Sequence, residues 1–259
     1  MKIAVFGARG RMGTEVCQMV TAQPDLELVA AIDVGDSPDL ATGADVAVDF
    51  THPDAVMDQV EWCVSHGLPV VVGTTGFTDE RLDRVRAMLG PDPQIGVMIA
   101  PNFSIGAVLT MHFSAIAAPY FESVEIIEAH HAAKADAPSG TAATIARMVD
   151  QARQAASSPA MPDATTHEAP GARGTLSNGV RVHSLRLPGL IAQHEVRLTS
   201  SGETLSIIND ARSRSSYMPG VLQGIRWVQA HQGLTVGLEA VLGLDRPDTV
   251  QASPGSATK

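Results

Sequence analysis

Lys2-Ile-Ala-Val-Phe-Gly7-Ala-Arg-Gly10-Arg-Met-Gly13 begins with an apolar run and ends with three glycines, each three residues after the one before. The apolar run favours a β-strand, and the pattern from about residue 14 to 22 favours a helix. In such a connection Gly7 permits a tight turn, and Gly13 permits close packing of helix on strand. Gly10 leaves the backbone open to a phosphate group at the helix start. This order of elements predicts a dinucleotide-binding unit, whereas the glycines alone would also fit a structural turn.

A second apolar run, residues 26–32, ends at Asp33, twenty residues after Gly13. An acidic residue at this place accepts hydrogen bonds from the ribose hydroxyls of the adenosine half of a dinucleotide. The plainer alternative is an aspartate in a turn after a strand. Val34 follows in place of an arginine that would bind a 2′-phosphate, although Arg9 and Arg11 in the glycine loop are near enough to tolerate one. We therefore expect NADH to be favoured and NADPH to be usable.

The rest of the first hundred residues alternates between short apolar strands and helices. The strands are expected at 45–49, 68–72 and 95–99, and the helices at about 54–65 and 78–89. This alternation predicts an α/β domain with a Rossmann-like, doubly wound parallel sheet. The loops at the carboxyl ends of the strands, where such folds bind ligands, are Phe50-Thr-His-Pro53, Gly73-Thr-Thr-Gly76 and Ala100-Pro-Asn-Phe103.

The composition excludes several classes of protein. A formal net charge of −10 over 259 residues argues against nucleic acid as a partner, because phosphate binding needs a basic face. Cys17 and Cys63 form no CxxC pair and suggest a reducing compartment. No signal peptide or membrane-spanning run is visible. We expect a cytoplasmic protein with no membrane partner and no metal site, and a disordered tail over residues 245–259.

The second half of the chain has a different pattern. A helix at about 104–117 leads to a strand from Ser123, and three later strands, at 180–186, 194–199 and 203–208, follow without helices between them. This predicts an α+β domain with a mixed, largely antiparallel sheet. A final helix at about 216–229 is long enough to return to the first domain. The expected division is 1–103 with 213–244 for the dinucleotide-binding domain, and 104–212 for a substrate-binding and oligomerisation domain.

Between the two halves lies Glu128-Ala-His-His-Ala-Ala-Lys-Ala-Asp-Ala-Pro-Ser-Gly-Thr-Ala142. Two histidines and a lysine precede a helix that Ser139 or Thr141 would cap. The start of a helix presents free N–H groups and a positive dipole end, which suit an anion. The alternative is a loop with solvated histidines before a capped helix, and this stretch alone leaves both interpretations open.

Together these motifs resemble the 4-hydroxy-tetrahydrodipicolinate reductase family, also called dihydrodipicolinate reductase. The matching stretches are 7–13, 49–53, 73–76, 100–103, 128–142, 182–189 and 214–220, and the resemblance covers residues 2 to about 244. It implies an enzyme of lysine and diaminopimelate biosynthesis that reduces a cyclic imine dicarboxylate with NADH or NADPH. It also implies a homotetramer formed through the sheet of the second domain.

The resemblance implies a role for each matching residue. His130 would be the proton donor or acceptor near the substrate ring, and Lys134 the second proton donor. The substrate carboxylates would be bound by His131, Gly140 and Thr141. The cofactor would be bound by Gly7, Ala8, Arg9, Gly10, Arg11, Met12, Asp33, Gly73, Thr74, Thr75, Ala100, Pro101, Asn102 and Phe103.

Two departures from the family pattern and two rival functions remain at this point. Ala133 stands where members often have a histidine, and Asn209 stands where one is expected. One rival is another two-domain NAD(P)-dependent dehydrogenase, which would account for residues 1–103 but not for His-His-x-x-Lys and the motif after it. The other rival is a non-catalytic redox sensor that binds a dinucleotide, which would need no proton donors in its second domain.

Overall fold

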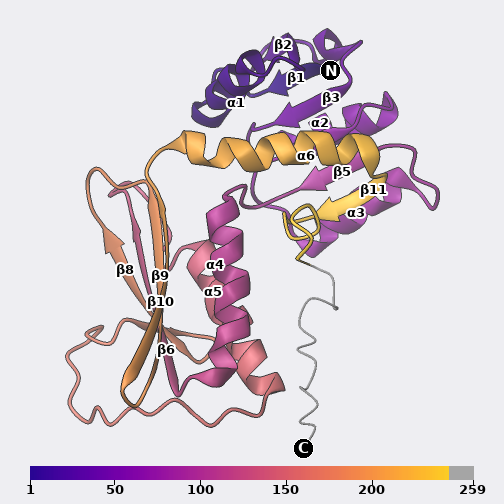
Figure 1. The fold of residues 1–259 in the computed structure, drawn as a ribbon. Helices are drawn as coiled ribbons and strands as arrows, with labels where there is room; N and C mark the ends of the chain where they lie inside the picture. The colour runs from indigo at the N-terminus through magenta and orange to yellow at the C-terminus, as the bar shows by residue number, and fades with distance from the viewer. Residues whose placement is uncertain (245–259) are drawn as a thin grey trace, which may run out of the picture.

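The structure, a computed structural model, describes residues 1–244. The predicted disorder of residues 245–259 lies outside the described residues. Two β-sheets with their own helices organise the chain, and Figure 1 shows the first above the second. No helix among residues 1–244 is long and apolar enough to cross a membrane.

The first sheet has six parallel strands in the order β11-β5-β4-β3-β1-β2. Their bounds are β1 Lys2–Phe6, β2 Glu27–Ile32, β3 Val46–Asp49, β4 Val70–Val72, β5 Gly96–Ile99 and β11 Gly233–Val236. The chain moves outward from β1 in one direction to β2 and in the other through β3, β4 and β5. The predicted doubly wound parallel sheet is confirmed, and ligands of such sheets bind at the carboxyl ends of the strands.

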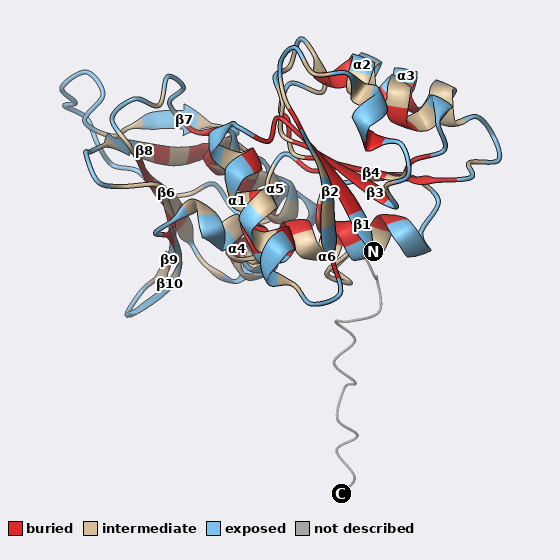
Figure 2. Ribbon diagram, turned by 90° about the horizontal axis from the view of Figure 1, so that it is seen from above, coloured by how far each residue is buried: buried red, intermediate tan, exposed pale blue. Residues whose placement is uncertain are grey.

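Helices cover both faces of this sheet, as Figure 2 shows by the buried strands between them. α1 (Arg11–Ala22) and α6 (Met218–Ala230) pack on one face, and α2 (Val56–Ser65) and α3 (Asp79–Leu89) pack on the other. Strands covered on both faces need continuous rather than alternating apolar residues, and Val46–Asp49 and Val70–Val72 are buried throughout. A short 3-10 helix, η1 (Pro38–Ala41), follows β2.

The second sheet has five strands in the order β10-β9-β6-β8-β7. Their bounds are β6 Ser123–His130, β7 Thr175–Ser177, β8 Val180–Arg186, β9 Ala192–Ser200 and β10 Glu203–Ala211. Only β6 and β8 pair in parallel, so the predicted mixed, largely antiparallel sheet is confirmed. The sequence prediction missed β7 and ended β10 three residues early. β7 has only three residues, and Asn209 and Asp210 at the end of β10 have low strand propensity. Pairing with a neighbouring strand decides the conformation of both segments.

α4 (Ile105–Ala117) and α5 (Gly140–Ala155) cover one face of the second sheet (Figure 1). Along β6, Val124 and Ile126 point into the core with Ile145 of α5, and the residues between them are only partly buried. The other face has no helix of residues 1–244 over it. This alternation is typical of a sheet with one covered face.

Two connections join the sheets. The first runs from β5 through residues 100–104 to α4, and the second runs from β10 through η3 (Arg214–Tyr217) to α6. Together they bring the carboxyl ends of β1, β3, β4 and β5 to the end of β6 and the start of α5. The predicted domain boundaries at 103/104 and 212/213 fall within these connections, and they stay a prediction.

Candidate active site

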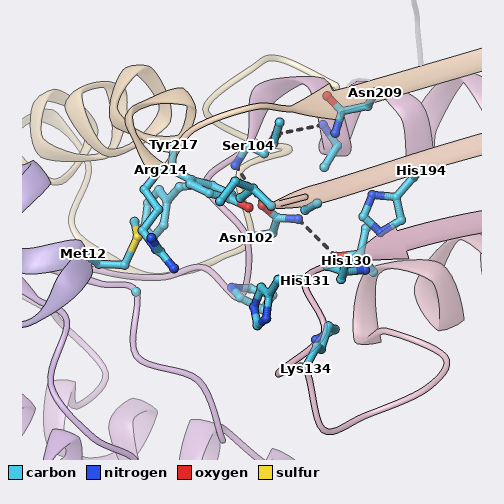
Figure 3. A pocket seen from close by; sticks show the side chains of 18 of the residues that line it. Met12, Asn102, Ser104, His130, His131, Lys134, His194, Asn209, Arg214 and Tyr217 are labelled. Carbon is cyan, nitrogen blue, oxygen red and sulfur yellow. Dashed lines mark hydrogen bonds between the residues drawn. The ribbon is translucent and has the colours of Figure 1, made fainter. Parts of the chain in front are cut away.

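A cavity of about 360 Å³ lies where the two sheets meet, and we call it the cleft. Figure 3 shows that its side chains come from both halves of the chain. The first half and the η3 connection contribute Arg11, Met12, Phe50, Gly73, Pro101, Asn102, Phe103, Arg214 and Tyr217. The second sheet, the loop after β6 and the start of α5 contribute His130, His131, Lys134, Thr141, His194 and Asn209. The fold thus brings the predicted cofactor loops and the predicted proton donors to one place.

The glycine loop has the geometry that a dinucleotide needs. Gly7 has a φ of +75°, and its N–H donates to the carbonyl of Ile32 at 2.8 Å. α1 begins directly after Gly10, whose position carries no capping side chain, so the first N–H groups of the helix have no side-chain acceptor at this cap. A second cavity of about 430 Å³ runs from Gly7 and Gly10 to Asp33. Backbone donors beside an open cavity fit a pyrophosphate followed by an adenosine ribose.

The carboxylate of Asp33 is held by its own loop. It accepts the N–H of Arg9 at 2.6 Å and that of Val34 at 2.8 Å. The backbone hydrogen bonds from Val34 and Arg9 keep the pKa of Asp33 below its usual value, so the group is ionised near neutrality. Its remaining lone pairs are free to accept ribose hydroxyls in the cavity.

Asp36 is a residue that the sequence analysis missed. Its Oδ2 accepts the N–H of Asp33 and the guanidinium of Arg9, both at 3.0 Å. Arg9 was expected to tolerate a 2′-phosphate, but in the structure it pairs with this second carboxylate. No local sequence signal marks Asp36, because an aspartate in a turn is common.

The loop after β4 is tied to the loop after β3 by a buried hydrogen bond. Thr74 Oγ1 donates to Oδ1 of the buried Asp49 at 2.6 Å, so this hydroxyl points into the protein. A Cβ on Gly73 would lie only 2.1 Å from the Phe50 ring. The loop therefore offers its backbone to a ligand, and Thr75 lines an adjoining cavity of about 640 Å³.

His130 is the last residue of β6, and its ring faces the cleft. Its Nδ1 lies 2.5 Å from Oε2 of the fully buried Glu128. Burial lowers the pKa of His130, with smaller contributions from the positive charges of Lys134 and Arg186, and Glu128 opposes this shift. His130 is therefore neutral at pH 7, with its proton on Nδ1, and Nε2 is an acceptor.

A carboxylate of the chain itself, that of Asp136, lies beside Lys134 near the start of α5. Lys134 Nζ pairs with Asp136 at 2.7 Å, and this bond, with a smaller contribution from the Gly140 N–H, lowers the pKa of Asp136. Ser139 caps α5 by accepting the N–H of Ala142 at 3.2 Å, which settles the choice between Ser139 and Thr141 as the cap. Thr141 Oγ1 accepts from Asn102 Nδ2 at 3.2 Å and so links the two halves of the cleft.

His194 and Asn209 also face the cleft and were not assigned a role from the sequence. The His194 ring packs edge-on against His130, with 5.3 Å between ring centroids. Burial lowers the pKa of His194 to about 4, so it is neutral too. His194 and Asn209 stand opposite each other on paired strands, and only that pairing, with the register of β6, brings them to His130.

A dinucleotide-type glycine loop faces a histidine and a lysine across one cleft, and the carboxylate of Asp136 lies beside this lysine near the start of α5. Fold and site together define a two-domain NAD(P)H-dependent oxidoreductase.

The N-terminal and C-terminal regions of dihydrodipicolinate reductase match residues 1–103 and 106–242. The 4-hydroxy-tetrahydrodipicolinate reductase of Cutibacterium acnes is 56% identical over 95% of this chain and 100% of its own length. The 4-hydroxy-tetrahydrodipicolinate reductase of Thermobifida fusca is 59% identical over 94% of this chain and 100% of its own length. The dipicolinate-bound dihydrodipicolinate reductase of Paenisporosarcina has a TM-score of 0.80 at 34% identity, over 93% of this chain and 98% of its own.

The chain therefore belongs to the dihydrodipicolinate reductase family. Members of this family reduce 4-hydroxy-tetrahydrodipicolinate with NADH or NADPH in lysine biosynthesis. The predicted family, enzyme class, reaction and cofactor type are confirmed. Both rivals lose their support, because the match extends over both halves of the chain.

Proposed function

We propose that, in reducing the cyclic imine dicarboxylate to tetrahydrodipicolinate, this chain uses His130 to exchange a proton near the substrate ring and Lys134 as the second proton donor. When bound, NADH or NADPH would supply the hydride. The observation that carries the proposal is the cleft, which places His130 and Lys134 opposite the loops expected to hold the cofactor (Figure 3). The glycine loop, Asp33 and the backbone around Gly73 and Asn102 would hold that cofactor.

The substrate carboxylates would be bound by His131, Lys134 and the N–H groups of Gly140 and Thr141. The ion pair between Lys134 and Asp136 supports this, because Lys134 already pairs with a carboxylate. Substrate binding would then exchange Asp136 for a substrate carboxylate as the partner of Lys134. Dipicolinate, which is bound in the Paenisporosarcina reductase, has two ring carboxylates and is a suitable unreactive probe for this chain.

The same exchange would change the protonation of His130. In the protein without substrate, burial and nearby positive charges keep its imidazole neutral. Two substrate carboxylates close to Lys134 would offset the positive charges and raise the pKa of His130. His130 would then take up a proton on Nε2 and could serve as a general acid during hydride delivery.

The test of the reaction is oxidation of NADH with substrate produced in the assay by dihydrodipicolinate synthase. Turnover that depends on the synthase supports the proposal. Binding of NADH without turnover would contradict it.

We further propose that NADH is the preferred cofactor, because Asp33 and Asp36 place two carboxylates where a 2′-phosphate would lie. Asp33→Ala is expected to raise the KM for NADH by about 10-fold, because only NADH offers both ribose hydroxyls to the carboxylate. The KM for NADPH should rise less.

Asp36→Asn, which releases Arg9, is expected to lower the KM for NADPH by about two- to fivefold and to leave the KM for NADH unchanged. Steady-state kinetics with both cofactors measures these effects, and equal losses for the two cofactors in Asp33→Ala would refute the assignment.

A homotetramer built through the second sheet is the remaining part of the proposal. The face of this sheet that α4 and α5 leave open carries Leu185 and Ile208, which are 39% and 57% exposed. Apolar side chains on an open sheet face favour burial against a partner. Sedimentation velocity of the whole chain is expected to give four times the chain mass of 27.1 kDa, and a monomer at micromolar concentration would contradict this assembly.

A further inference from the structure

Glu128 is a fully buried carboxylate that accepts hydrogen bonds from several residues. His130 Nδ1 lies 2.5 Å from Oε2, and the Ser139 N–H donates to Oε1 at 3.2 Å. The guanidinium of Arg186 donates to both oxygens, at 3.0 and 2.8 Å. Arg186 also donates to the carbonyl of Asp136 at 2.5 Å. One carboxylate–guanidinium pair therefore contacts the histidine, the loop that carries Lys134 and the cap of α5.

The acceptor on one nitrogen of a neutral imidazole determines which tautomer is present. Because Glu128 can only accept, the His130 proton stays on Nδ1 and Nε2 is free toward the cleft. We propose that Glu128, held by Arg186, is a positioning residue that fixes this tautomer of His130 and the place of the 131–139 loop. The inference rests on the role proposed above for His130.

A purely structural ion pair is the competing explanation. Buried ion pairs stabilise a fold little compared with apolar residues of the same size. The same strand also offers a matched comparison, because Glu125 accepts from His183 Nε2 at 2.7 Å and pairs with Arg173. Glu125 lies three residues before Glu128, so it points to the opposite face of the sheet and does not line the cleft. Glu125 therefore contacts a histidine and an arginine, as Glu128 does, but it lies outside the cleft.

The charge of Glu128 also raises the proton affinity of His130, against the larger opposite effect of burial. The titratable groups that face His130 are Glu128 on its own strand, Lys134 from the loop, Arg186 from β8 and His194 from β9. Burial lowers the pKa of His130, Lys134 and Arg186 add to this, and the Glu128 carboxylate opposes it. Removal of the carboxylate charge would therefore lower the pKa of His130 further. The limb of the pH–rate profile that reports His130 would move to lower pH.

Glu128→Gln in the full chain is expected to lower kcat by roughly 10- to 100-fold, with the His130 limb at lower pH. The dissociation constant of NADH should stay within about twofold, because Glu128 lies away from the glycine loop. Glu128→Asp keeps the charge and should restore part of the rate and the position of the limb. Glu125→Gln is the control and should leave kcat and the profile unchanged.

Two results would overturn the inference. One is a kcat within twofold of the unmodified chain in Glu128→Gln, and the other is a lower kcat with an unmoved pH limb, which would show a structural role alone.

If Glu128→Gln fails to fold, nitrogen NMR of the unmodified chain determines which tautomer of His130 is present, with the His130 signals assigned by their loss in His130→Gln. A proton on Nδ1 supports the inference, and a proton on Nε2 overturns it. Full activity of His130→Gln would instead refute the proposed function, so the two failures are distinguishable.

Discussion

His130→Gln is expected to lower kcat by roughly 10²–10⁴-fold, the usual effect of losing a general acid or base. Glutamine has a similar reach and still forms hydrogen bonds, but it cannot exchange a proton near neutral pH. NADH should bind nearly unchanged, because His130 comes from the second sheet and the glycine loop from the first. The measurement is steady-state turnover together with the dissociation constant of NADH.

His66→Gln is the matched control for this variant. The exposed His66 directly follows α2, and it lines neither the cleft nor the cavity beside Asp33. Its replacement should leave kcat within about twofold. If His130→Gln also stayed within a few-fold of the unmodified chain, the proton would come from another group, and Lys134 would be the first candidate.

Gly13→Ala is expected to lower the free energy of unfolding by about 3 kcal/mol, because a Cβ cannot be accommodated there. The added carbon would lie 2.0 Å from the carbonyl oxygen of Gly7 and 2.8 Å from Cα of Ala8. α1 would have to move away from β1, and the loop would lose its shape. Urea denaturation measures the loss of stability, and titration with NADH should show weaker binding in the same variant.

Gly140→Ala is the control for this effect. Gly140 also lies in the first turn of a helix, but a Cβ there would meet no atom within 4 Å. Its replacement should change the free energy of unfolding by no more than about 1 kcal/mol, with helix propensity acting in its favour. Equal losses in the two variants would mean that close packing at Gly13 is not the cause.

The part of the site that lies in short continuous stretches of the chain could be predicted from the sequence. The glycine loop and the strand-end loops are recognisable because a tight turn and a close approach need glycine at particular positions. His130 and Lys134 are four residues apart, and the helix start follows within the same stretch. Their roles came from the family resemblance, because the stretch alone left a loop with solvated histidines as an alternative.

The residues that hold His130 in place could not be predicted in this way. Arg186 reaches Glu128 over 58 residues of sequence, and His194 reaches Ser139 over 55. The sequence around Arg186 and His194 does not distinguish them from other polar residues in strands. Their contacts depend on the parallel pairing of β6 with β8 and the antiparallel pairing of β6 with β9. A shift of either register by one residue would turn them to the other face.

The sequence by itself determined the class of the first sheet, the position of the glycine loop and the local cluster of His130 with Lys134. These features depend on backbone conformation and apolar periodicity over a few residues, so neighbouring residues in the sequence are enough to predict them. Only the tertiary structure decided that Asp36 pairs with Arg9 and that Asp136 pairs with Lys134. It also decided that Glu128 contacts His130 and binds Arg186. A side chain's partner, charge state and tautomer follow from what folding brings within hydrogen-bond distance, and in the case of Arg186 that partner is remote in sequence.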